Sequence, residues 1–295
     1  MGSTMSGADR DVERLADWIG RSETRDDHIT EAPVAAMSAT LDRDDPPPRP
    51  GDALPPLWHW LYFLPRPLRR DLGLDGHAKL GGFLPPVPLP RRMWAGSQLQ
   101  FHQPLRVGDA VRRASRIADV QVKRGRSGTL VFVKVQHEIS GPQGLAITEF
   151  HDIVYRAPPA AGSAAAPTTP APPDPAWVRN IVPDEALLFR YSALTFNGHR
   201  IHYDHPYVTQ VEGYAGLVVH GPLIATLLLE QLRDRLAAEQ PGTSIVGFEF
   251  RAVRPTVHTE RFAVCAEPLA DGREVRLWAR KPDGSLTMDA TATIG

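Results

Sequence analysis

The chain of 295 residues contains a single cysteine, Cys265. One thiol can form neither an internal disulfide nor a cysteine cluster for zinc, so we expect a protein of a reducing compartment such as the cytoplasm. No apolar run approaches the roughly 20 residues that a membrane-spanning helix needs, and no basic-then-apolar signal opens the sequence. These features predict a cytoplasmic protein without a membrane partner.

The sequence also has no excess of charge of either sign. Lys and Arg number 33 against 34 Asp and Glu, and no long basic run is present, which disfavours a nucleic-acid partner. No Walker or Gly-x-Gly-x-x-Gly loop follows a predicted strand, and His-Glu-x-x-His and Cys-x-x-Cys spacings are missing. We therefore expect no metal and no cofactor.

One segment divides the chain. Residues 157–175 consist of Ala, Pro, Ser and Thr, apart from Gly162 and Asp174. Such a composition cannot bury enough apolar surface to become ordered. We interpret it as a linker between an N-terminal half, residues 1–156, and a C-terminal half, residues 176–295.

Both halves contain a series of strand-like runs joined by short turns. In the first half these runs are 98–101, 110–122, 129–138 and 145–155. In the second half they are 245–250, 260–267, 273–280 and 285–294. The repeated order indicates a duplicated domain.

Leucine and isoleucine at three- and four-residue steps predict a helix over 222–240, which a Pro-Gly pair ends. A helix followed by an antiparallel sheet predicts an α+β fold in which the sheet wraps the helix. In the first half prolines between 85 and 90 obscure the matching helix, so we expect it to be degenerate and to leave room for a ligand tail. A short helix is expected at 9–20, and the aromatic run 58–64 is interpreted either as core or as pocket lining.

Two short stretches before the apolar helix carry the most chemical information. Asn197 and His202 are polar groups of one loop, which Gly198 allows to turn tightly, and such a pair could hold a water molecule. Histidine can accept and return a proton near neutral pH. Gly221 begins the predicted helix, where free N–H groups favour negative charge, including that of a thioester oxygen as it becomes an enolate.

The stretch 190–204, RYSALTFNGHRIHYD, resembles the hydratase motif of MaoC-like enzymes. It is still more similar to the type-2 hydroxyacyl-thioester dehydratases and the mesaconyl-C4-CoA (3-methylfumaryl-CoA) hydratases. The likeness continues at 212–214 and 217–223, and in the first half at 81–86 and 91–96. This resemblance implies a double hot-dog fold and a hydratase/dehydratase that adds water to, or removes it from, a 2-enoyl acyl-CoA.

The resemblance also implies roles for individual residues. His202 is expected to be the principal acid or base. Asn197 stands at the position of the MaoC aspartate, and since an amide can orient water but cannot take its proton, Asn197 is expected to position water or substrate. The residues expected to contact the substrate are Tyr191, Gly198, Arg200, His220 and Gly221.

Arg200 has two interpretations. It is either a solvated loop charge, paired with Asp204, or a clamp for the second carboxylate of a dicarboxylic acyl-CoA such as mesaconyl-C4-CoA. His199 is interpreted as a neighbour without a catalytic role. Asp204 is expected to hydrogen-bond the local turn, and His220 to shape the turn before the helix.

Two other functions stay open at this point. The missing aspartate suggests a non-catalytic acyl-thioester binding module. A hot-dog thioesterase would need a carboxylate that activates water against the thioester carbonyl, and none stands between Asn197 and His202. The acyl chain, the direction of the reaction and a homo-oligomeric state are left open.

Overall fold

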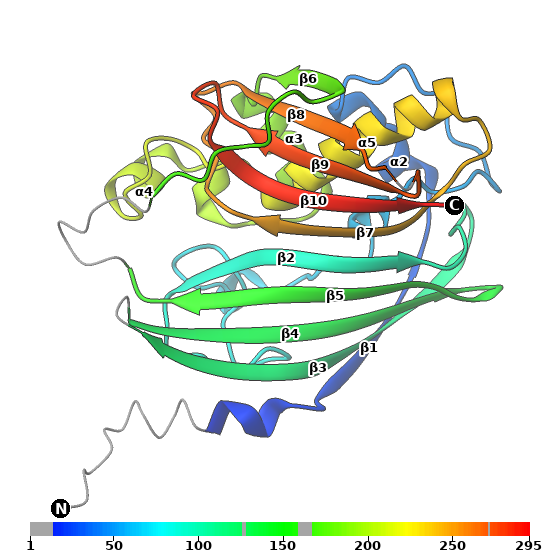
Figure 1. Cartoon of the computed structure of the whole chain (residues 1–295). Helices are drawn as coiled ribbons and strands as arrows, with labels where there is room; N and C mark the ends of the chain where they lie inside the picture. Colours follow the sequence, from blue (N-terminus) through cyan, green and yellow to red (C-terminus); the bar gives the residue numbers. More distant parts are fainter. Residues whose placement is uncertain (1–13, 126–127, 159–166, 271) are drawn as a thin grey trace, which may run out of the picture.

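The computed structural model describes residues 14–125, 128–158, 167–270 and 272–295 (Figure 1). The strands of the N-terminal half are β1 (Ser22–His28), β2 (Arg91–Phe101), β3 (Ala110–Gly125), β4 (Gly128–Gly141) and β5 (Gly144–Arg156). Those of the C-terminal half are β6 (Trp177–Ile181), β7 (Ile245–Ala252), β8 (Phe262–Pro268), β9 (Glu274–Arg280) and β10 (Leu286–Ile294). Together they form one sheet with the order β1-β3-β4-β5-β2-β7-β10-β9-β8-β6.

The two halves have the same topology. The order β1-β3-β4-β5-β2 in the first half matches β6-β8-β9-β10-β7 in the second, and the central β2 and β7 pair antiparallel. Each strand run expected from the sequence is found, most of them longer than expected, and β2 begins at Arg91. The α+β double hot-dog prediction is confirmed.

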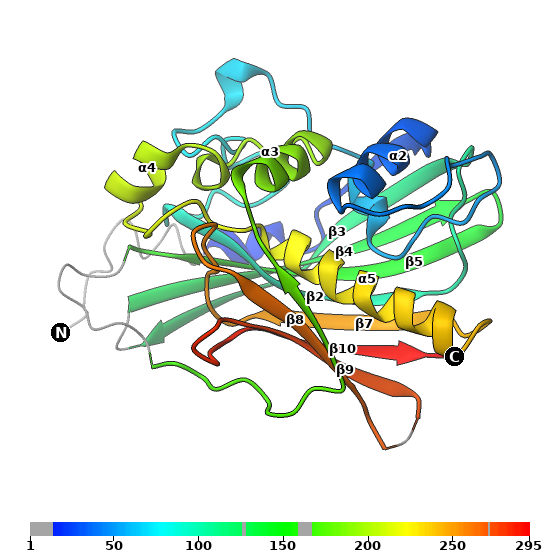
Figure 2. The same cartoon turned by 90° about the horizontal axis from the view of Figure 1, so that it is seen from above.

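The helices lie on one side of the sheet (Figure 2). The α-helices are α2 (Glu31–Thr40), α3 (Glu185–Leu194), α4 (His205–Gln210) and α5 (Gly221–Glu239), and the 3₁₀ helices are η1 (Arg14–Trp18), η2 (Trp58–Leu61), η3 (Arg69–Asp71) and η4 (Arg200–His202). The long helix α5 packs against β7 to β10 and buries Leu223, Leu228 and Leu232 completely. Burial of these side chains contributes on the order of 1.5–3 kcal/mol each.

Among its described residues the first half has no counterpart of α5. Its proline-rich segment 85–90 is irregular, and its α-helix, α2, lies much earlier, next to β1. The helix expected at 9–20 is found in part: residues 14–18 form the 3₁₀ helix η1, and 9–13 lie outside the described residues. None of the helices in the described part of the chain is long and apolar enough to cross a bilayer.

The proposed linker is described only at its ends, because residues 159–166 lie outside the described ranges. Near its C-terminal end, Pro170 forms a bridge with Ser285, and the Leu286 N–H donates to the Thr169 carbonyl at 2.8 Å. This end therefore follows the β9–β10 turn. The division into halves at 157–175 remains our proposal.

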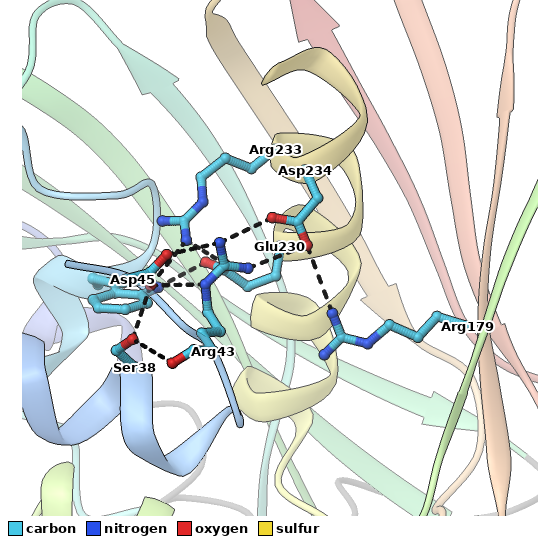
Figure 3. A network of polar contacts seen from close by, with 8 residues as sticks. Ser38, Arg43, Asp45, Arg179, Glu230, Arg233 and Asp234 are labelled. Carbon is cyan, nitrogen blue, oxygen red and sulfur yellow. Dashed lines mark hydrogen bonds and ion pairs between the residues drawn. The ribbon is translucent and has the colours of Figure 1, made fainter. Parts of the chain in front are cut away.

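An ion-pair network fastens α5 to the segment that follows α2 (Figure 3). Glu230, whose side chain is 2% exposed, lies 2.7 Å from Arg43 Nη1 and 2.8 Å from Arg233 Nη2. Trp58 Nε1 donates to its other oxygen at 2.8 Å. Asp45 and Asp234 complete the network around Arg43. A buried carboxylate needs such partners to stay charged. Since Arg43 and Trp58 belong to the first half and Glu230 to the second, these contacts also join the two halves.

Candidate active site

A cavity of about 1400 Å³ lies under the helix layer. Its wall combines the segment 60–84, the inner face of β4 and β5, the loop after α3 and the first turn of α5. Both halves of the chain therefore contribute to one space. No helix as long as α5 occupies this space in the described part of the first half; that the space receives a ligand tail stays a prediction.

His202 lies on this wall at the end of η4 and is 7% exposed. Its Nδ1 donates to the Val218 carbonyl at 2.6 Å, so the lone pair of the neutral ring is on Nε2. Burial lowers the pKa of His202 to about 4, although the hydrogen bond to Val218 opposes this shift. The ring is thus a neutral base at physiological pH, with its orientation fixed by the backbone.

His220 and Gly221 form the start of α5 beside His202. The His220 ring stacks on His202, and its Nε2 is hydrogen-bonded to the Ser192 hydroxyl at 2.8 Å. Gly221 lines the cavity, and apart from its chain neighbours and the helix backbone no described atom lies within 4 Å of the position a Cβ would take there. The Gly221 N–H is the first backbone donor of α5 and lies at the positive end of the helix dipole. Pro222, the next residue, has no N–H.

Asn197 lines the same cavity but is tied to its own loop. Its Oδ1 accepts the His199 N–H at 3.0 Å, and its backbone N–H donates to the Ser192 carbonyl at 2.8 Å. Phe196 before it adopts a positive φ of 49°, which makes the turn tight. Within the described residues no hydrogen bond joins the side chains of Asn197 and His202, and the amide Nδ2 is left as the donor available to a ligand.

Tyr191 and Gly198, both expected at the substrate, line the cavity too. The Tyr191 side chain is 1% exposed and its ring centroid lies 5.0 Å from that of His220. Burial raises its pKa, so its hydroxyl remains protonated. The Gly198 carbonyl accepts a hydrogen bond from the Tyr203 hydroxyl at 3.0 Å.

Arg200 points elsewhere and is not among the described residues that line the cavity. Its Nε and Nη2 donate to Asp204 at 2.9 and 2.8 Å, and its Nη1 donates to the Leu74 carbonyl at 2.9 Å. The guanidinium also lies 4.0 Å over the Tyr207 ring. These contacts agree with the interpretation of Arg200 as a loop charge paired with Asp204. Asp204 also accepts the Tyr207 N–H and caps α4, as expected of a turn residue.

Sequence reasoning missed a second polar group at the cavity. Asp75 and His77 come from the first half, yet they lie against His199 and form with it a set of metal-ligand-type atoms within 4.8 Å of one another. The sequence offers only an Asp-x-His pattern as a signal. Their meeting with His199 depends on how the two halves pack, which no local spacing reveals.

A polar belt crosses the inner face of the first-half sheet, and it was missed as well. Glu149 accepts hydrogen bonds from Trp60 Nε1 at 3.0 Å and from His151 at 2.6 Å, and its second oxygen is hydrogen-bonded to His59 at 3.1 Å. Despite burial, His151 and His59 hold the pKa of Glu149 well below its usual range. The aromatic run 58–64 thus serves both expected purposes: Trp58 is core, and Trp60 lines the cavity.

Comparisons with known proteins agree with this geometry. Residues 57–258 match the family model described as hydroxyacyl-thioester dehydratase type 2. The chain is 48% identical over 278 residues to the mesaconyl-C(4)-CoA hydratase of Chloroflexus aurantiacus, covering 94% of this chain and 97% of the relative.

Solved structures show the same fold at low identity. HtdX of Mycobacterium tuberculosis superposes with a TM-score of 0.64 at 21% identity, covering 92% of this chain and 99% of the other. Another Mycobacterium tuberculosis protein, described as having a double hotdog fold, superposes with a TM-score of 0.58 at 14% identity, with 96% and 98% coverage.

Proposed function

The chain belongs to the hydroxyacyl-thioester dehydratase type 2 family, and from this premise we propose that His202 and Gly221 carry out the hydration of an acyl thioester in its cavity. The protein is a hydro-lyase that acts on acyl-CoA. The observation that carries the assignment is His202 itself. It is a buried, neutral imidazole with Nδ1 committed to a carbonyl, and it lies beside the open N-terminus of α5.

In the hydration direction, His202 Nε2 accepts a proton from water as the water oxygen bonds to C3 of the 2-enoyl chain. The electron pair of the double bond moves toward the thioester, whose oxygen becomes an enolate. The Gly221 N–H stabilises this negative charge. His202 then returns the proton to C2, so that the elements of one water molecule have been added. Asn197 Nδ2 positions the substrate or the water, and dehydration follows the same path in reverse.

We propose a short dicarboxylic acyl-CoA as the substrate, as the name of the Chloroflexus relative suggests. The cavity supports this assignment because three nitrogen-bearing side chains of the first half stand in its otherwise largely apolar wall: His137, His151 and Arg113. Among the described residues, Arg113 Nε is buried without a hydrogen-bond partner, its Nη2 donates to the Phe63 carbonyl at 3.4 Å, and its guanidinium lies 5.2 Å over the Phe63 ring. Burial lowers the pKa of Arg113. Glu149, Glu23 and Asp27 act on Arg113 through space, but within the described part of the chain no carboxylate forms an ion pair with it, and a desolvated cation of this kind favours an anionic ligand group.

The test is a comparison of two substrates in two variants. We expect Arg113→Met to lower the preference for mesaconyl-C4-CoA over crotonyl-CoA about tenfold, which is the effect of a lost charge-assisted hydrogen bond worth ~1.5 kcal/mol or more. Arg200→Met is the matched control, since it removes an arginine outside the cavity. An unchanged substrate ratio in Arg113→Met would exclude the dicarboxylic assignment while leaving the hydratase activity in place.

The thioesterase alternative predicts a different product. Hydration removes the conjugated thioester absorbance without releasing a thiol, whereas a thioesterase releases free CoA. A thiol reagent in the same assay therefore separates the two.

The single, buried cysteine Cys265 supports our proposal that the enzyme works in the cytoplasm, which cell fractionation would check.

A further inference from the structure

Hydration needs the attacking water to be held in place as well as deprotonated. His202 offers one acceptor, and Asn197 has its oxygen committed to the His199 N–H. We propose that His77, oriented by Asp75, is a second acceptor for the attacking water, so that the N-terminal half contributes a catalytic group to the active site. This inference rests on the proposed hydratase function.

Asp75 and His77 form a hydrogen-bonded dyad. His77 Nδ1 donates to Asp75 Oδ2 at 2.8 Å, and the His77 backbone N–H donates to Asp75 Oδ1 at 3.0 Å. Both carboxylate oxygens are thus used to fix one imidazole. The proton of the neutral ring is on Nδ1, which leaves the lone pair on Nε2, as it does in His202. A ring fixed in this way presents its Nε2 as a hydrogen-bond acceptor in a defined direction.

The dyad faces the same cavity as His202. The His77 ring meets the His199 ring with centroids 4.0 Å apart, and His199 in turn lies edge-on to His202 at 5.4 Å. All three rings line the cavity. A water molecule has two protons to donate, so one can go to each lone-pair nitrogen, His202 Nε2 and His77 Nε2. Its oxygen then keeps a lone pair for C3 of the substrate.

The segment that carries the dyad is docked onto the catalytic loop. The Arg200 N–H donates to the Asp75 carbonyl at 2.8 Å, and Arg200 Nη1 donates to the Leu74 carbonyl. Gly76, at a φ of 86°, packs so closely on the Gly198 carbonyl that no Cβ would fit between them. Arg200 therefore holds the segment that carries Asp75 and His77 against the loop that carries His202.

The electrostatics agree with this role. Burial alone would raise the pKa of Asp75, yet the hydrogen bonds from His77 hold it below its ordinary value. Burial lowers the pKa of His77, and nearby Arg92 adds to this, although Asp75 opposes it. The carboxylate is thus charged and the imidazole neutral. In the reaction His202 takes one water proton and delivers it to C2, while the other stays on the new hydroxyl, hydrogen-bonded to His77.

The test compares His77→Gln, Asp75→Asn and His202→Gln with the parent enzyme on an enoyl-CoA that the parent hydrates. His205→Gln is the matched control, because His205 is exposed and lies outside the described cavity lining. We expect His77→Gln to lower kcat by roughly 10²-fold with KM within about threefold. Asp75→Asn should lower kcat less, and imidazole should partly restore a His77→Gly variant. Rescue by a free base would not follow from a purely structural role.

The outcomes separate the two claims. If the parent hydrates the substrate and His202→Gln does not, but His77→Gln keeps kcat within about twofold, only the dyad inference fails. If the activity of the parent is lost with a chelator and restored by Zn²⁺, the three side chains hold a metal and the dyad inference is also wrong. If the parent hydrates no enoyl-CoA at all, the proposed function itself fails, and the inference fails with it.

Discussion

The imidazole rings of His202 and His220 stack face to face, with centroids 3.6 Å apart and planes inclined by 18°. Both rings are buried, and burial lowers the pKa of His202 to about 4 and that of His220 well below its ordinary value. Two imidazolium ions in this contact would repel each other strongly. Burial, more than the stack itself, therefore keeps the base neutral and ready to accept a proton across the physiological pH range.

The activity should reflect this neutral state. We expect kcat/KM for hydration to be constant from neutral pH down to about 5 and to fall only as His202 becomes protonated, with an apparent pKa near 4. A pH–rate profile with a stability control at each pH measures this. An acidic limb near pH 6.5, the ordinary histidine value, would contradict the buried, stacked arrangement.

The free energy of unfolding should decrease as the pH falls, because several buried histidines resist protonation in the folded protein. The pKa values of His202, His220, His199 and His137 are all lowered by burial. In the unfolded chain these groups bind protons below about pH 6.5, while in the folded protein they do not. The unfolded state thus gains protons first, and each histidine weakens folding by up to about 1.4 kcal/mol per pH unit as the pH falls below 6.5.

Urea unfolding between pH 7.5 and 5 measures this linkage, with the range chosen to stay above the titration of the carboxylates. No change is expected above about pH 7, and a steep loss is expected below 6.5. A free energy of unfolding that stays level down to pH 5 would show that the histidines are protonated in the folded state.

Arg200→Met should not alter substrate selection. Its guanidinium is bound to Asp204 and to the Leu74 carbonyl rather than exposed to the cavity. We expect the same ratio of rates on crotonyl-CoA and mesaconyl-C4-CoA as in the parent, together with a lower Tm and a lower kcat, because the segment carrying His77 loses its anchor. A shift of the ratio toward crotonyl-CoA would restore Arg200 as a reader of the carboxylate.

The buried ion pairs of Glu230 should contribute more to the free energy of unfolding than an exposed ion pair of the same helix does. Arg43→Met removes a partner 2.7 Å from a carboxylate that is 2% exposed, and we expect a loss of about 2–4 kcal/mol in the free energy of unfolding. Arg235→Met is the control, because the Arg235–Glu239 pair is roughly half exposed, at 45% and 47%, and should cost less than about 1 kcal/mol. Equal losses in the two variants would mean that burial of Glu230 does not govern its contribution.

Much of this architecture is predictable from sequence because its signals are local. The leucines of α5 repeat at helical spacing, the strands β3 to β5 and β10 contain several β-branched residues each, and the strands of both halves are separated by turn residues. The edge strand β1, Ser-Glu-Thr-Arg-Asp-Asp-His, escapes such reasoning because it is entirely polar and is held by pairing with β3. The helix α2 escapes because its alanines and its proline give no clear apolar face.

The residues of the site likewise fall into those that local sequence motifs reveal and those that only packing brings together. His202, Asn197 and Gly221 belong to two short motifs that any reader of the sequence can find. Asp75 and His77 could not be placed, because their position depends on a close backbone contact, Gly76 on Gly198, between halves that are distant in the chain. The orientation of Arg200 was equally hidden, since side chains alternate along a loop and the choice between Asp204 and the cavity is made by packing.

The most direct test of the account follows the conjugated thioester absorbance of mesaconyl-C4-CoA with the parent protein and with His202→Gln, both checked for folding by circular dichroism. We predict that the parent removes the absorbance without releasing a thiol, and that His202→Gln does so ~10²–10⁴-fold more slowly. Turnover by a folded His202→Gln protein at close to the parent rate would contradict the assignment of His202 as the base.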